Sequence, residues 1–278
     1  MKSTYAKDIS IVPATNLLTT NGIHFYNFIK HELIPYLEGS FKTSPFMTIV
    51  GEGKAANFVT HFLKEPEPVF NAYVCATPEF ANYSPEIIKS YSLKRLEAID
   101  NTYFIYGSNA KGQTTDELFG RFSEIGTYLT SFEAKNLNFT FDKFENSPGF
   151  LSTIAETIPR AMTKIFALYS KISKSEFEKS IKDLEPLEAI KYVENKYLDI
   201  QYLYGSNLNV RLDDIYAIEG IVIDKQDGDY LRVLGDFVAI KYPDLHLGDY
   251  YVGKYYELGK DYEKADFYYK AAYGKMNL

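Results

Sequence analysis

The 278-residue sequence predicts an α/β protein in which a parallel sheet with flanking helices is followed by an all-α part. Two observations support this fold class. Before residue 170, short runs that are apolar throughout alternate with amphipathic runs of helical length, which is typical of βαβ units. After residue 173 the strand-like runs stop and only helical periodicity continues. We therefore expect two domains, over residues 1–172 and 173–278.

The first domain is expected to contain four strands separated by helical segments. An amphipathic helix over residues 23–37 precedes them, and Pro35 is expected to distort its last turn because proline lacks the N–H group. The expected strands are residues 46–50, 70–76, 102–106 and 138–144. The expected helices between and after them are residues 54–63, 116–136 and 153–170. This alternation predicts a parallel sheet covered on both faces.

The second domain is expected to contain six helices separated by Gly- or Pro-containing breaks. They are residues 175–184, 186–204, 213–224, 229–241, 247–258 and 262–273. The last two helices carry small and aromatic residues at the offsets of a tetratricopeptide repeat, namely Gly253, Tyr256, Ala265, Tyr269 and Ala272. Such arrays need about three repeats, so a generic helical hairpin is the alternative interpretation. Either helical surface could bind another protein.

Composition and charge exclude several classes of function. The 30 basic and 37 acidic side chains give a net charge of -7, which argues against a nucleic-acid partner. The longest apolar runs have strand length, so we expect no membrane span. The single cysteine, Cys75, is too little for a disulfide or a zinc site and is expected to be buried and inert. The four histidines lack metal-binding spacing, and we expect neither a metal nor another cofactor.

Residues 46–56 have the strand, sharp turn and helix layout of a nucleophile elbow. The residues at the five positions of its G-x-S-x-G pattern are Gly51, Glu52, Gly53, Lys54 and Ala55. Around this segment, residues 28–171 resemble an esterase family of α/β-hydrolases that includes enterochelin esterase and esterase D. The matching segments are residues 31–37, 48–51, 70–78 and 139–146. The resemblance implies an α/β-hydrolase sheet and, in its active members, cleavage of carboxylic esters by a serine and a histidine.

Two catalytic positions of that family are not retained in this sequence. The position of the nucleophilic serine is Gly53, which has no side chain. The family's histidine follows the 139–146 segment, where this chain instead continues through Pro148. Asp116 or Glu117 could remain as the acid, but an orienting carboxylate needs a histidine. The sequence therefore predicts a catalytically inactive homologue that acts as a binding or scaffold protein.

Two alternatives to an inactive scaffold remain open. The chain could be an active carboxylic-ester hydrolase that uses unconventional residues, such as Glu52 as nucleophile or base, or residues from outside this sequence. The C-terminal helices could instead carry the function as a protein-interaction module. Ser108 and Ser147 are expected to form turns rather than to act as nucleophiles. The free N–H groups at the start of the elbow helix could bind a small anion, a carboxylate or a phosphate.

The N-terminal region raises a separate expectation about the sheet. The family has further strands ahead of the first helix, whereas about 20 residues precede it here, with residues 9–12 as one short strand. We expect either an N-terminal truncation or another element over this edge, since an exposed edge promotes aggregation. Residues 1–6 lack the apolar stretch of a signal peptide. The chain as given therefore predicts a cytoplasmic protein, and a truncated start leaves a periplasmic or exported one open.

Overall fold

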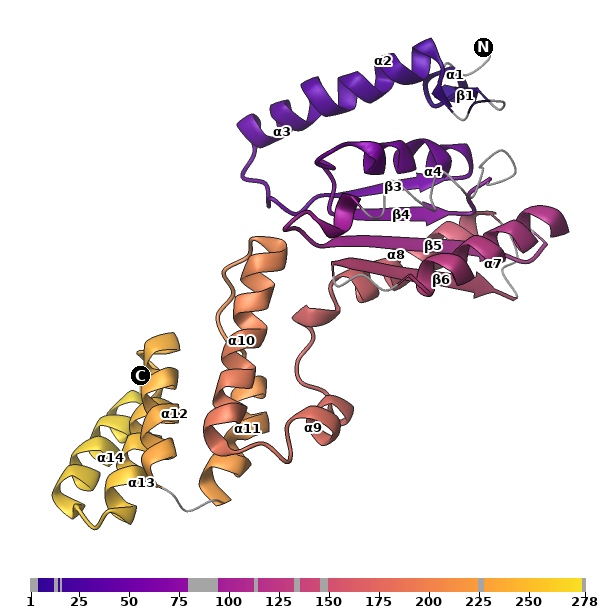
Figure 1. Cartoon of the computed structure of the whole chain (residues 1–278). Helices are drawn as coiled ribbons and strands as arrows, with labels where there is room; N and C mark the ends of the chain where they lie inside the picture. Colours follow the sequence, from indigo (N-terminus) through magenta and orange to yellow (C-terminus); the bar gives the residue numbers. More distant parts are fainter. Residues whose placement is uncertain are drawn as a thin grey trace. The chain divides into compact units, whose positions relative to one another are not determined.

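The computed structural model describes residues 5–12, 15, 17–79, 95–112, 115–132, 136–145, 150–224 and 228–276 (Figure 1). The chain divides into two compact units, unit 1 (Met1–Ala167) and unit 2 (Leu168–Leu278). Unit 1 contains a parallel sheet with flanking helices, and unit 2 is helical. The predicted fold class is confirmed.

The sheet of unit 1 contains four parallel strands in the order in which they occur along the chain. They are β3 (Thr48–Glu52), β4 (Ala72–Ala76), β5 (Tyr103–Ala110) and β6 (Leu137–Phe144). Each strand pairs with the next one, and Gly51 lies beside Cys75, which lies beside Gly107. Because all four strands are parallel, their C-terminal ends meet at one edge of the sheet, the edge where open α/β sheets bind ligands.

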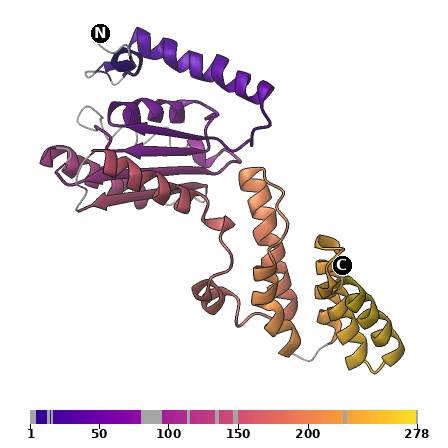
Figure 2. The same cartoon turned by 180° about the vertical axis from the view of Figure 1, so that it is seen from behind.

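Helices cover both faces of this sheet, which continues the predicted βαβ order. The helices on one face are α4 (Lys54–Val59), its 3₁₀ extension η2 (Thr60–Lys64) and α7 (Asp116–Thr130). Helix α8 (Phe150–Ile165) packs on the opposite face, where Ala161 and Ile165 contact Val74 and Tyr106 (Figures 1 and 2). The core of unit 1 therefore has two layers, one on each side of the sheet.

A long helix packs on the outer side of α4 and η2. It consists of α2 (Thr20–Phe28), the π-helical turn η1 (Ile29–Leu33) and α3 (Ile34–Ser40). The Tyr26 ring stacks on Phe62 at 4.1 Å, and Glu65 accepts a hydrogen bond from the Tyr26 hydroxyl and pairs with Lys30 at 2.8 Å. Pro35 follows the π-helical turn, because it cannot donate to the carbonyl one turn earlier. The distortion therefore precedes Pro35, and the predicted ending at residue 37 is three residues short.

The start of the chain forms short elements, namely α1 (Tyr5–Asp8) and an antiparallel hairpin of β1 (Ile11–Val12) and β2 (Leu17–Leu18). No strand in the described residues pairs with the outer side of β3, and Val50 on that strand is 46% exposed. In the described part of unit 1, every exposed large apolar side chain except Ile158 lies between Tyr5 and Val50. The exposed apolar side chains of the described part of unit 1 are thus concentrated in its first 50 residues.

Unit 2 begins with the short 3₁₀ helix η4 (Ala167–Tyr169), at the boundary between the units, and continues as six helices in the described residues. They are α9 (Lys174–Ser180), α10 (Pro186–Tyr204), α11 (Leu212–Asp224), α12 (Gly228–Lys241), α13 (His246–Leu258) and α14 (Tyr262–Met276). Their bounds agree closely with the predicted helices, except that α9 ends at Ser180 rather than at residue 184. Local signals explain this agreement, since Ser173 and Glu176 form a capping box and Gly205 ends α10 in the left-handed conformation.

Helices α13 and α14 form the predicted helical hairpin. A Cβ atom at Gly253 would lie 2.7 Å from the ring of Tyr269, so only glycine allows this approach. Ala265 and Ala272 are buried on the facing side of α14. The small residue Gly253 of α13 therefore leaves room for the ring of Tyr269 of α14.

We predict that Gly253→Ala lowers the free energy of unfolding by about 1–3 kcal/mol, because the added methyl group overpacks the contact with Tyr269. Gly220→Ala in the middle of α11 is the matched control, since a Cβ atom there meets nothing within 4 Å. In the control, the higher helix propensity of alanine should raise the free energy of unfolding by about 0.5–1 kcal/mol. Chemical denaturation followed by circular dichroism measures both changes. Equal effects of the two substitutions would contradict the close approach.

Candidate active site

The elbow turn is retained in unit 1. Strand β3 ends at Glu52, α4 begins at Lys54, and Gly53 between them has φ +55° and ψ −118°. Residues with a side chain rarely adopt such a positive φ, whereas glycine does so at little cost. A Cβ atom at Gly51 would lie 2.5 Å from the carbonyl oxygen of Ala55, so glycine is required where strand and helix approach. The backbone therefore has the sharp strand-to-helix turn of a nucleophile elbow.

The position at the tip of this turn has room for a side chain but carries none. A Cβ atom built on Gly53 meets no heavy atom within 4 Å. The Gly53 N–H group donates to the carbonyl of Ala76 at 3.0 Å, which ties the turn to the neighbouring strand. The turn is thus fully formed, while the nucleophile that such a turn presents is missing.

Glu52 lies beside the tip and is held by the end of the next strand. Its Oε1 atom accepts a hydrogen bond from the Thr77 hydroxyl at 3.0 Å. Burial raises the pKa of Glu52, the hydrogen bond from Thr77 lowers it, and the charge of Glu79 raises it again, with a net upward shift. Thr77 itself has a positive φ of 41°, and its N–H group donates to Ser108. This arrangement offers a carboxylate and a hydroxyl, but no acyl-accepting group at Gly53.

None of the four histidines forms a hydrogen bond with an elbow residue among the described contacts. His61 is buried in η2, eight residues after Gly53, which corresponds to about 12 Å along a helix. Its Nδ1 atom lies 3.1 Å from the Lys64 ammonium, and burial together with that charge lowers its pKa to about 3. His24 and His31 belong to the outer helix, and His246 belongs to unit 2. The predicted site of histidine loss near Pro148 falls in residues 146–149, outside the described residues.

Asp116 and Glu117, the predicted remnant acids, lie in the exposed first turn of α7. Glu117 pairs with Arg121 at 2.6 Å, one turn along the same helix. Neither carboxylate bonds to an elbow residue among the described contacts. Their position at a helix N-terminus, where the helix dipole favours acids, accounts for them.

Two further side chains at the sheet are also unavailable as nucleophiles. Ser108 lies inside β5, so its predicted place in a turn is wrong. Gly107 is needed within this strand, because a Cβ atom there would lie 2.6 Å from the Phe141 ring. The Ser108 hydroxyl is buried at 2.7 Å from the Thr157 hydroxyl. Cys75 is buried as expected, and burial raises the pKa of its thiol to about 12.

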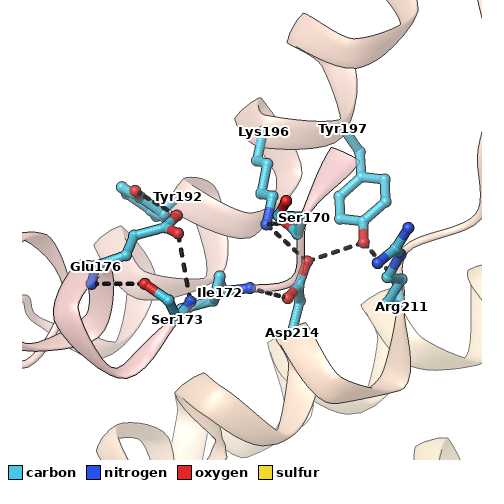
Figure 3. A network of polar contacts seen from close by, with 9 residues as sticks. All are labelled: Ser170, Ile172, Ser173, Glu176, Tyr192, Lys196, Tyr197, Arg211 and Asp214. Atoms are coloured by element: carbon cyan, nitrogen blue, oxygen red, sulfur yellow. Dashed lines mark hydrogen bonds and ion pairs between the residues drawn. The ribbon is translucent and has the colours of Figure 1, made fainter. Parts of the chain in front are cut away.

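The most buried charged group of unit 2 forms a structural network that sequence reasoning missed (Figure 3). Asp214 accepts hydrogen bonds from Lys196 at 3.0 Å, from the Tyr197 hydroxyl at 2.9 Å and from the N–H group of Ile172 at 2.7 Å. Lys196 also donates to the carbonyl of Ser170 at 2.7 Å. Because Asp214 is fully buried and its partners satisfy both oxygens, the network joins the start of unit 2 to α10 and α11 rather than forming a reactive site.

The described residues contain no group of three or more His, Cys, Asp or Glu side chains that could hold a metal ion. No helix in the described part of the chain combines the length and apolar character needed to cross a bilayer. Among the described features of unit 1, the elbow is therefore the one that resembles a known catalytic motif.

Known structures resemble this fold, although the sequence matches no protein-family model and no curated protein. An uncharacterised protein from Capnocytophaga ochracea DSM 7271 aligns with a TM-score of 0.80 at 22% identity, over 96% of this chain and 73% of that chain. An IroE-like serine hydrolase from Shewanella oneidensis aligns with a TM-score of 0.52 at 15% identity, over 84% of this chain and 75% of that chain. The chain therefore has an α/β fold similar to that of this serine hydrolase.

We predict that a thiol placed at the elbow tip is accessible. Gly53→Cys should react with Ellman's reagent in the native state, because the space around a Cβ atom there is open. The native protein is the control and should not react, since Cys75 is its single cysteine and is buried. A Gly53→Cys protein that reacts only after unfolding would show that the tip is covered.

We also predict a pH-dependent gain of stability in Glu52→Gln. The pKa of Glu52 is raised in the folded state, so its ionised form disfavours folding above that pKa. The variant should therefore melt at a higher temperature than the native protein near neutral pH. The difference should shrink as the pH falls to the ordinary glutamate value of 4.5. Glu97→Gln, on an exposed residue, is the control, and a gain that does not depend on pH would contradict the assignment.

Proposed function

We propose that this protein is a catalytically inactive homologue of esterase-like α/β-hydrolases that acts by binding rather than by hydrolysis. The observation that carries the proposal is Gly53, which has the backbone conformation of a nucleophile elbow and no side chain. A serine hydrolase needs a hydroxyl at this point and a histidine beside it. Neither group is present among the described residues around the turn.

The surroundings of the elbow support this proposal over an active hydrolase with unconventional residues. Glu52 would have to act as nucleophile or base, but its carboxylate is engaged by Thr77 at 3.0 Å. His61 is buried, and its lowered pKa leaves it a weak base. Ser108 and Cys75 are buried in the sheet. The residues that could act as nucleophile or base in place of a serine and a histidine are therefore poorly placed.

The predicted anion at the elbow receives little support from the same geometry. Helix α4 has only six residues, so its dipole is weak. The carboxylate of Glu52 lies beside its first turn, and the charge of Glu79 acts on it. These negative charges would repel a carboxylate or a phosphate, so the anion is not part of the proposed function.

A second candidate is protein interaction through unit 2, the domain that we propose as tetratricopeptide-like. Gly253 packs against Tyr269, and Ala265 and Ala272 are buried, as the small and aromatic positions of such a repeat require. Tyr262, Tyr273 and Met276 of α14 are each more than 60% exposed. Changing Tyr262 to lysine should leave the melting temperature unchanged, whereas a loss of stability would show that this side chain serves folding rather than a partner.

Ester hydrolysis tests the inactive assignment directly. The full chain should hydrolyse p-nitrophenyl acetate and p-nitrophenyl butyrate no faster than buffer. Gly53→Ser should show no burst of p-nitrophenol, because the new hydroxyl lacks a base. Turnover by the native chain that is abolished by Glu52→Gln or Thr77→Val would overturn the proposal in favour of an unconventional hydrolase.

A further inference from the structure

A cavity of about 320 Å³ opens in unit 1 away from the elbow. It is lined by the first halves of β5 and β6, by the end of α8 and by Thr130 and Phe132 at and just after the end of α7. The lining residues that matter below are Phe104, Tyr106, Asn138, Thr140, Lys164 and Ile165. The elbow lies at the C-terminal ends of the parallel strands, whereas these strand residues lie toward the N-terminal ends. The cavity is therefore separate from the elbow.

On one side the cavity borders the end of α8, which packs over the central strands. Ile165 and Ala161 of α8 pack over β4 and β5, against Val74 and Tyr106. Strand β6 lies beyond this contact at the edge of the sheet, where Asn138 pairs in register with Phe104. Asn138 is exposed on this strand, and the cavity is lined on both sides of β6, by Lys164 and Ile165 of α8 and by Thr130 and Phe132 at the end of α7.

The cavity combines an apolar floor with a polar side. Phe104 and the buried Ile165 contribute apolar surface. The Tyr106 hydroxyl is engaged, since it donates to Asp142. Asn138 and Thr140, on the wall formed by β6, carry an amide and a hydroxyl that can donate hydrogen bonds.

One cation at the cavity has no counter-ion in the described residues. Arg160 lies one turn before Lys164 on α8 and has carboxylates nearby, with Asp142 at 4.0 Å and Glu156 at 3.7 Å. Lys164 lines the cavity and forms no ion pair with any side chain in the described part of the chain. An anionic group in the cavity would supply the missing negative charge.

We propose that this cavity binds a small carboxylate with an aromatic or branched aliphatic body. Its volume is at the lower end of the range for small-molecule sites. The carboxylate would pair with Lys164 and accept hydrogen bonds from Asn138 and Thr140, while the apolar body would lie against Phe104 and Ile165. This inference does not depend on the elbow being inactive, since the cavity lies toward the N-terminal ends of the strands and the elbow lies at their C-terminal ends.

Phenylacetate is the probe, with uncharged phenylacetamide as its matched analogue. In amide NMR spectra of the full chain, phenylacetate should shift signals of β6 and of the end of α8 in a saturable way. Lys164→Ala should weaken the binding about fivefold or more, as expected for loss of a charge-assisted hydrogen bond. Thr140→Val, which keeps the side-chain shape, should weaken it about twofold or more.

Lys143→Ala is the control variant, because Lys143 is exposed on the same strand and does not line the cavity. It should leave the binding unchanged within about twofold. Equal losses in Lys143→Ala and Lys164→Ala would show general attraction to positive charge and would overturn the site. Equal affinity for phenylacetamide, or no saturable shift on β6, would overturn it as well.

Discussion

The close approach of β3 to α4 at Gly51 is the constraint on which the elbow depends. A side chain there would collide with the carbonyl of Ala55 at 2.5 Å, so the strand can turn directly into the helix only because this residue is glycine. Gly53 then adopts the positive φ that reverses the chain within one residue. Helix α4 consequently lies flat on the sheet, and its Phe58 and Ala56 join Tyr73 and Cys75 in one apolar cluster.

Because the strands are parallel, the C-terminal and N-terminal ends of the sheet carry different chemical groups. At the C-terminal edge the strands end in the polar groups of Glu52 and Thr77 beside a turn without a nucleophile. Away from that edge, α8 leaves β6 partly uncovered and Lys164 without a counter-ion in the described residues. Besides the turn at Gly53, which carries no side chain, unit 1 thus has a cavity that combines apolar surface with a positive charge.

Much of the fold could be predicted from the sequence, because its signals are local. Apolar runs predicted all four strands, and caps and glycines predicted the helices of unit 2. The extension of β5 to Ala110 was missed because Gly107 looks like a strand breaker, whereas it makes room for Phe141 on the adjacent strand. The pair of Lys196 and Asp214 was missed because the two residues are far apart in sequence and no local pattern marks them. That position 53 carries no side chain can be read from the sequence itself.

The glycine at position 53 also has a physical consequence for stability. A residue with a side chain at φ +55° stores backbone strain of about 1–3 kcal/mol, which an enzyme tolerates in return for an exposed hydroxyl. Glycine removes most of that strain while the hydrogen bond from Gly53 to Ala76 keeps the turn in place. Glycine at this position is therefore favoured by folding itself. The geometry of the turn then follows from the packing of α4 on the sheet, and it does not by itself imply catalysis.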